Sequence, residues 1–226
     1  AADGGGGGGG ASPPPPPSPH LEALLQRLRA NRTPRPRVAA NFGQTLKISA
    51  ATLDAWANGL RVSRGEGEPW LLWLLEFPKD SEPNLRRELE ARGVPREQVV
   101  FTPLTPRGGH IEAHRLADLV LDTPFYNGGA TGLDVLWAGV PSLTLPAVPS
   151  SPDATPLSRM GASLHRGLLQ HRAGEKREAL LFVADTLKGY ERQMGGLLGA
   201  PGADARLGAL EMLLRRAGGG GAAASP

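Results

Sequence analysis

Cysteine is absent from this chain of 226 residues. Without it, the protein cannot build a disulfide scaffold, a thiolate metal site or a cysteine nucleophile. Aromatic residues make up only 5% of the chain, which is too few for a platform on which nucleic-acid bases stack. The net charge is only +3, and arginines lie between glutamates along the helical segments. We therefore expect a mildly basic, solvated surface, small anionic ligands and no nucleic-acid partner.

Long apolar runs are also missing. The longest, Trp70–Leu75, is far shorter than the roughly 20 residues that span a bilayer. The N-terminus has no basic start followed by an apolar stretch, so we expect neither a membrane partner nor a secretory signal. The chain does not begin with methionine, which is consistent with a processed product or a piece of a longer protein.

Glycine and proline are abundant, with 31 and 22 residues, and they gather at the two ends. Residues 1–19 form a glycine run and then a proline run, and residues 217–226 contain only Gly, Ala, Ser and Pro. Neither tail can bury apolar side chains, so we expect both to be disordered. Residues 20–37 predict a short amphipathic helix and a linker. Residues 38–216 then remain as one domain.

From Val38 onward, short apolar runs alternate with amphipathic segments. This alternation is typical of a Rossmann-like α/β fold, with a parallel sheet and helices on both faces. Ser49 is expected to cap a helix that ends at Gly59. The tryptophans at 56, 70, 73 and 137 fall on apolar faces and are expected in the core. The predicted strands are 38–42, 69–77, 98–102, 119–122 and 142–145, and the predicted helices are 49–58, 82–92, 110–117 and 130–138, with further helices up to 216.

In parallel sheets, ligands bind beyond the carboxyl ends of the strands. The loop after the first predicted strand carries Gln44 and Lys47. A lysine ammonium suits phosphate oxygens, and a glutamine can donate to phosphate or to a sugar hydroxyl. The alternative is an ordinary surface lysine.

A second candidate is the loop that leads into the helix predicted at 130. Small residues there leave backbone N–H groups open to an anion, and the helix dipole adds to the attraction. Gly129 and Ala130 are the small residues, Thr131 adds a hydroxyl, and Asp134 could accept from ribose hydroxyls. The alternative is a glycine-rich turn without a ligand.

The third candidate is the loop that holds Thr105, Arg107 and His110, where Arg107 and His110 could stack on a base or meet phosphate. His110 alone is also consistent with an unliganded helix start. The remaining histidines lack metal-ligand spacing with acidic partners. Asp118 and Asp122 straddle a helix–strand boundary and form no obvious acid/base pair.

Several strings of this sequence together resemble the C-terminal catalytic lobe of protein O-GlcNAc transferases. The resemblance covers about residues 38–162, and it is most specific over 121–141. The strings are FGQTLKI at 42–48, LWLL at 72–75, FTP at 101–103, LDTPFYNG at 121–128 and TGLDVLWAGVP at 131–141. SRMGAS at 158–163 is similar to the Ser-Arg-Val-Ala-Ala-Ser helix start of the family.

The resemblance implies an inverting glycosyltransferase of the two-lobed GT-B type. Its members transfer GlcNAc from UDP-GlcNAc to Ser or Thr hydroxyls of nuclear and cytosolic proteins, without a metal or other cofactor. By this resemblance, Gln44 and Lys47 would contact the diphosphate, and Lys47 would stabilise the UDP leaving group. Thr105, Arg107 and His110 would contact uracil. Gly129, Ala130 and Thr131 would contact phosphate, and Asp134 would bind ribose.

The chain also departs from the family pattern. His-Thr-Thr of the family is Gly129-Ala130-Thr131 here, a Lys is Arg107, and an Arg falls at about Ala113. Each lost polar contact costs roughly 1–3 kcal/mol, so we expect weaker donor binding.

The catalytic histidine of the family lies in an N-terminal lobe, for which residues 1–37 have no room. We therefore expect half an enzyme, inactive alone. Two alternatives remain: a lobe that uses GDP-fucose, as in Spindly-type O-fucosyltransferases, and a non-catalytic nucleotide-sugar-binding or interaction module.

Overall fold

The computed structural model shows one α/β unit. Both predicted disordered tails lie outside the described residues, as do Thr105 and Arg107. The domain boundaries that we expected at 38 and 216 therefore stay predictions. The described residues are 36–63, 70–104, 110–147, 154–169 and 182–199, together with Glu22 and Gln26.

The strands form the five-stranded sheet that the sequence predicts, in the order β3-β2-β1-β4-β5. Every neighbouring pair is parallel. The last strand is shorter than predicted, because Thr144 leaves β4 and makes an isolated parallel bridge with Val183 instead. The strands are β1 (Val38–Asn41), β2 (Leu71–Leu75), β3 (Val99–Thr102), β4 (Leu119–Leu121) and β5 (Ser142–Leu143).

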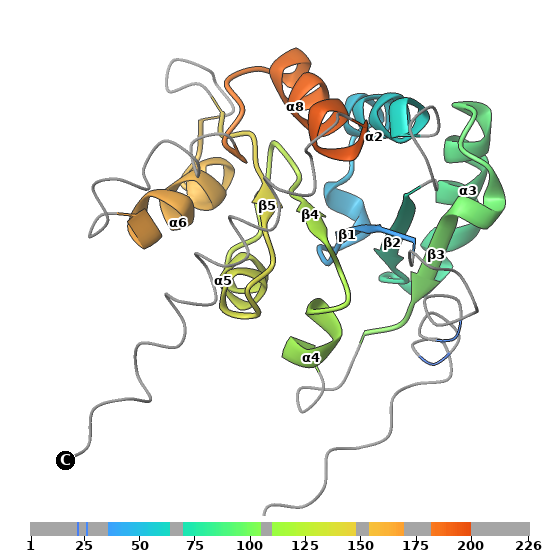
Figure 1. Ribbon diagram of the computed structural model, residues 1–226, viewed down its shortest axis with the longest axis horizontal. Coiled ribbons are helices and arrows are strands. Elements are labelled where there is room, and N and C mark those ends of the chain that lie inside the picture. The colour runs from blue at the N-terminus through green and yellow to red at the C-terminus, as the bar shows by residue number, and fades with distance from the viewer. Residues whose placement is uncertain are drawn as a thin grey trace, which may run out of the picture.

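Helices cover both faces of the sheet, as predicted (Figure 1). Helices α2 and α8 lie above it in the view of Figure 1, and α4 and α5 lie below it. Each strand contributes side chains to the core on both sides of the sheet, because successive side chains point to opposite faces. The helices are α2 (Ala50–Ser63), α3 (Glu82–Ala91), α4 (His110–His114), α5 (Ala130–Trp137), α6 (Met160–Leu169) and α8 (Leu187–Gly199).

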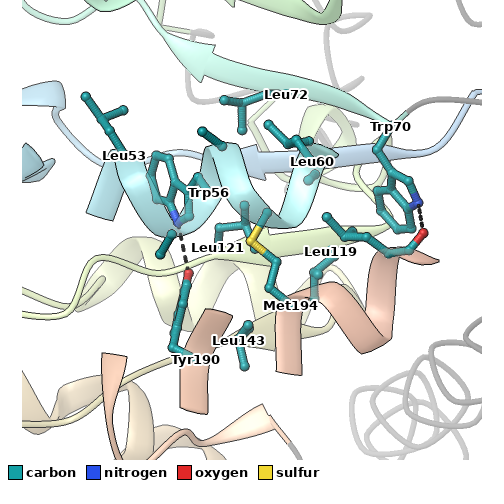
Figure 2. Close-up of a cluster of buried hydrophobic side chains, with 14 of the residues drawn as sticks. Leu53, Trp56, Leu60, Trp70, Leu72, Leu119, Leu121, Leu143, Tyr190 and Met194 are labelled. Atoms are coloured by element: carbon teal, nitrogen blue, oxygen red, sulfur yellow. Dashed lines mark hydrogen bonds between the residues drawn. The ribbon is translucent and has the colours of Figure 1, made fainter. Parts of the chain in front are cut away.

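Helix α2 begins as predicted and ends later than predicted. The Ser49 hydroxyl accepts a hydrogen bond from the backbone N–H of Thr52 at 3.2 Å, as a helix cap does. The prediction that Gly59 stops the helix is wrong, because α2 continues to Ser63. A Cβ atom at Gly59 would lie 2.7 Å from the sulfur of Met194. Glycine at this position therefore lets α8 approach α2 closely, as Figure 2 illustrates.

The tryptophans divide into buried and exposed ones. Trp56, Trp70 and Trp73 are buried, as predicted. Trp137 is 66% exposed, so its predicted place in the core is wrong. Helix α5 buries Val135 and Leu136 against the sheet, and the next residue turns by about 100° away from that face.

Helix α4 also ends earlier than predicted, at His114 instead of residue 117. The N–H groups of Leu116 and Ala117 donate to carbonyls three residues back, those of Ala113 and His114. Bonds of this spacing tighten the chain and close the helix. The turn leads directly into Asp118, whose carboxylate accepts from the N–H of Val38 at 2.8 Å.

Candidate functional site

A small cavity lies at the carboxyl ends of β1 and β4. These two strands are neighbours at the point where the strand order reverses, since β2 and β3 extend from the other side of β1. Open α/β sheets bind ligands at this switch point. The cavity has a volume of about 30 Å³, and its polar lining residues include Asn41, Lys47, Asp122, Thr123, Thr131 and Ser142.

The loop after β1 is tied to both neighbouring strands. Asn41 donates from its side-chain amide to the carbonyl of Leu121 at 2.6 Å, and its Oδ1 accepts from the N–H of Gly43 at 3.1 Å. Thr45 donates from its N–H and from its hydroxyl to the carbonyl of Phe77, at 3.0 and 2.9 Å. The short helix η1 (Thr45–Lys47) follows. These bonds fix the backbone that carries Lys47.

Asp122 organises the loop after β4. Its Oδ1 accepts from the backbone N–H groups of Thr123 at 2.9 Å and Gly128 at 2.8 Å. Its Oδ2 accepts from the hydroxyl of Thr144 at 2.8 Å. Burial raises the pKa of this carboxyl to about 6, although these hydrogen bonds and the charge of Lys47 oppose the rise. The carboxylate thus closes the loop over residues 122–128.

Tyr190 binds the backbone of Asp122, and Trp56 binds Tyr190 in turn. The hydroxyl of Tyr190, in α8, donates to the backbone carbonyl of Asp122 at 3.1 Å. The same hydroxyl accepts from the indole N–H of Trp56 in α2, also at 3.1 Å. Figure 2 shows this second bond within the apolar cluster between α2, α8 and the sheet. Both helices are therefore connected to the loop through one buried hydroxyl.

Lys47 lines the cavity and lies close to the Tyr126 ring and the Asp122 charge. Its Nζ lies 3.7 Å from the centroid of the Tyr126 ring. Burial lowers the pKa of Lys47, and the charge of Asp122 partly offsets this. Gln44 is exposed, and its backbone carbonyl accepts from the N–H of Lys47 at 3.0 Å.

The start of α5 faces the same cavity. Gly128 and Thr131 line it, and Gly129 is the residue that precedes the helix. A Cβ at Gly128 would lie 3.1 Å from the backbone nitrogen of Gly132, so the chain approaches itself closely here. A Cβ at Gly129 would meet no atom within 4 Å, and Ala130 is exposed. The structure thus brings Lys47 and Thr131 together, as we expected of strand-end loops.

His110 and Asp134 lie beside each other on α4 and α5. The Nε2 atom of His110 is 3.5 Å from Oδ2 of Asp134. The His110 ring packs edge-on against that of His114, with centroids 4.1 Å apart, and His114 lies 4.2 Å from the ring of Phe42. Burial, and then the charge of His110, lower the pKa of His114 to about 3. His114 is therefore a neutral neighbour of His110.

A second buried histidine lies next to the cavity. Nε2 of His165, in α6, is 2.9 Å from the hydroxyl of Ser142, which lines the cavity. Burial lowers the pKa of His165 to about 4. This pair is neutral at physiological pH and contributes packing and one hydrogen bond.

Sequence reasoning missed Asp122 and Tyr126 as residues of this site. The spacing of Asp122 from Asp118, which lies at the other end of β4, hides this role. The usable signal is its position directly after a strand, followed six residues later by glycine.

Within the described ranges, no group of three potential metal ligands gathers, and no helix is long and apolar enough to cross a bilayer.

Comparison with known proteins supplies the family. The model of glycosyl transferase family 41 matches residues 28–165, which is more than half of the chain. The chain belongs to glycosyl transferase family 41. This finding confirms the family to which the motifs at 42–48 and 121–141 point.

Individual relatives point to the same kind of protein. The chain is 41% identical over 109 residues to a probable UDP-N-acetylglucosamine–peptide N-acetylglucosaminyltransferase of Arabidopsis thaliana, and this match covers 48% of the chain. It is 40% identical over 110 residues to the Caenorhabditis elegans enzyme of that name, again over 48% of the chain. The matches cover only 11% and 9% of those relatives.

A solved structure supports the fold in the same way. A Thermobaculum terrenum O-GlcNAc transferase mutant superposes with a TM-score of 0.64 at 29% sequence identity. The match covers 80% of this chain and 31% of that one. The α/β fold predicted from strand–helix alternation is thereby confirmed as that of a family 41 lobe.

Proposed function

We propose that this chain is the UDP-GlcNAc-binding lobe of a transferase that moves GlcNAc to serine and threonine hydroxyls of proteins, with inversion. One observation carries the proposal. In a chain of family 41, a lysine ammonium and the start of a helix meet in a cavity at the switch point of the sheet. That combination suits the diphosphate of a nucleotide sugar.

The chemistry places the greatest demand on the diphosphate. When the bond between the sugar and UDP breaks, negative charge grows on the leaving phosphate. Positive groups fixed at that place stabilise the transition state more than the ground state. Lys47 supplies a charge, and the N–H groups at the start of α5 supply dipoles beside Thr131. Gln44, exposed and three residues before Lys47, would donate to the same phosphates.

The nucleoside would lie toward α4. His110 is partly exposed and faces Asp134, which can accept hydrogen bonds from ribose hydroxyls. Thr105 and Arg107 precede α4 in the sequence and would contact the uracil. Acceptor proteins would bind to a lobe that supplies the catalytic base, and the expected nuclear and cytosolic location stays a prediction.

Calorimetric titration of the 226-residue chain with UDP, UMP and GDP tests the proposal. We expect weak binding of UDP, still weaker binding of GDP, and a loss of UDP affinity in Lys47→Met. Lys79→Met changes an exposed lysine outside the site and is the matched control. The proposal is wrong if no nucleotide binds up to millimolar concentration. Tighter binding of GDP than of UDP would instead support a fucosyl donor.

A further inference from the structure

Tyr126 is an aromatic residue beside Lys47, which lines the cavity, and it has no role in the function described so far. It lies in the loop between β4 and α5, and it is 42% exposed. The face of its ring lies 3.7 Å from Nζ of Lys47. The electrons of an aromatic face attract an ammonium group, and the attraction grows as water is excluded.

Hydrogen bonds fix the backbone that carries the Tyr126 ring. The hydroxyl of Thr123 donates to the carbonyl of Tyr126 at 2.7 Å. Asp122 accepts from the N–H groups at both ends of the loop, those of Thr123 and Gly128. Asn127 adds a bond from its amide to the carbonyl of Thr123 at 2.8 Å. The ring is therefore attached to one of the most extensively bonded loops in the described structure.

Lys47 needs such a partner. Its side chain has four rotatable bonds, and fixing all of them costs up to about 2 kcal/mol in entropy. The oxygens of Asp122 are engaged by Thr123, Gly128 and Thr144, so this carboxylate attracts Lys47 through space. The Tyr126 ring is the surface on which the ammonium rests.

We propose that Tyr126 is a positioning residue that holds the Lys47 ammonium in the cavity, with one side against the ring and another available to the donor diphosphate. This inference rests on the proposed function. Because the ammonium is already placed, a diphosphate does not have to order the lysine when it binds. A monophosphate, which lacks the second phosphate group, benefits less.

Nuclear magnetic resonance of the free protein tests the placement without any ligand. Protons above an aromatic ring resonate upfield, so the Lys47 ε-methylene should be shifted upfield in the wild type. The shift should persist in Tyr126→Phe, which keeps the ring, and vanish in Tyr126→Leu. Phe125→Leu removes the neighbouring aromatic, which is 52% exposed, and should leave the shift unchanged. An unshifted methylene in the wild type would overturn the inference.

Titration with UDP and UMP tests the consequence. Tyr126→Leu should weaken UDP binding about two- to fivefold, the range of an exposed cation–ring contact, and weaken UMP binding less. Tyr126→Phe and Phe125→Leu should bind both as the wild type does. Equal weakening for UDP and UMP would indicate a damaged loop and contradict the inference, as would unchanged UDP affinity. Failure of the wild type to bind UDP would refute the proposed function, while the methylene shift would still decide where Tyr126 places Lys47.

Discussion

Replacing Asp122 by asparagine should change how the stability of the protein depends on pH. Asparagine has the same shape, and its Oδ1 can still accept from the N–H groups of Thr123 and Gly128. Its amide can donate to the hydroxyl of Thr144, which rotates to accept. The substitution therefore removes the charge and keeps the loop closed.

The size of the effect follows from the pKa of Asp122, which burial raises from 3.8 to about 6. One pKa unit corresponds to 1.36 kcal/mol, so the shift amounts to about 3 kcal/mol. The folded state binds this proton more tightly than the unfolded state does, and the wild type therefore loses stability as pH rises from about 4 to about 6. The loss levels off near pH 7, about one unit above the folded-state pKa, and Asp122→Asn has no such loss because it carries no titratable group at this position.

Urea unfolding at pH 4, 5, 6 and 7, followed by tryptophan fluorescence, measures this difference. Relative to the wild type, Asp122→Asn should gain about 2 kcal/mol in free energy of unfolding between pH 4 and pH 7, because part of the total shift is already lost at pH 4. Asp80→Asn alters an exposed carboxyl and is the control. If the curves for Asp122→Asn and the wild type ran parallel over this range, the buried charge would not exist as described.

Three further predictions concern the helix start and the core. Gly129→His combined with Ala130→Thr should tighten UDP binding by roughly 1–3 kcal/mol, because the space at Gly129 is open; unchanged affinity in calorimetry would argue against a phosphate there. Tyr190→Phe should lower the free energy of unfolding by about 1–3 kcal/mol, since the buried Trp56 N–H loses its acceptor, and chemical denaturation measures this loss. Trp137→Ser should change stability by less than about 0.5 kcal/mol, whereas Trp56→Ala should cost about 3–5 kcal/mol. A comparable fall in melting temperature for both would show that the exposure of Trp137 is misjudged.

The features predictable from the sequence are those that repeat or that end a strand. Apolar runs of strand length indicated all five strands, and the rule of strand-end loops placed Lys47 and Thr131 at one cavity, where the structure has them. Local pattern suffices here because parallel strands align their carboxyl ends.

The features that escaped prediction depend on contacts between distant residues. Gly59 has the signature of a helix end, and only the approach of Met194, 135 positions later, explains why the helix continues. The role of Asp122 arises from backbone N–H groups that only the folded loop presents. Trp137 lies about 100° beyond Leu136 around α5, and only the packing of the folded helix shows that this angle faces solvent.

The bond between Tyr190 and Asp122 has a consequence for biosynthesis. Every described residue that we expect to touch the donor is translated before residue 135, yet the hydroxyl that holds the Asp122 carbonyl arrives with α8. A nascent chain that has not yet released Leu187–Gly199 from the ribosome leaves Trp56, Leu60 and the strands beneath them uncovered. The bond to the Asp122 carbonyl thus forms late in synthesis, and until then the apolar cluster that α8 covers is not buried. A fragment truncated before Leu187 would keep all these residues and still lack the hydroxyl that holds the Asp122 carbonyl.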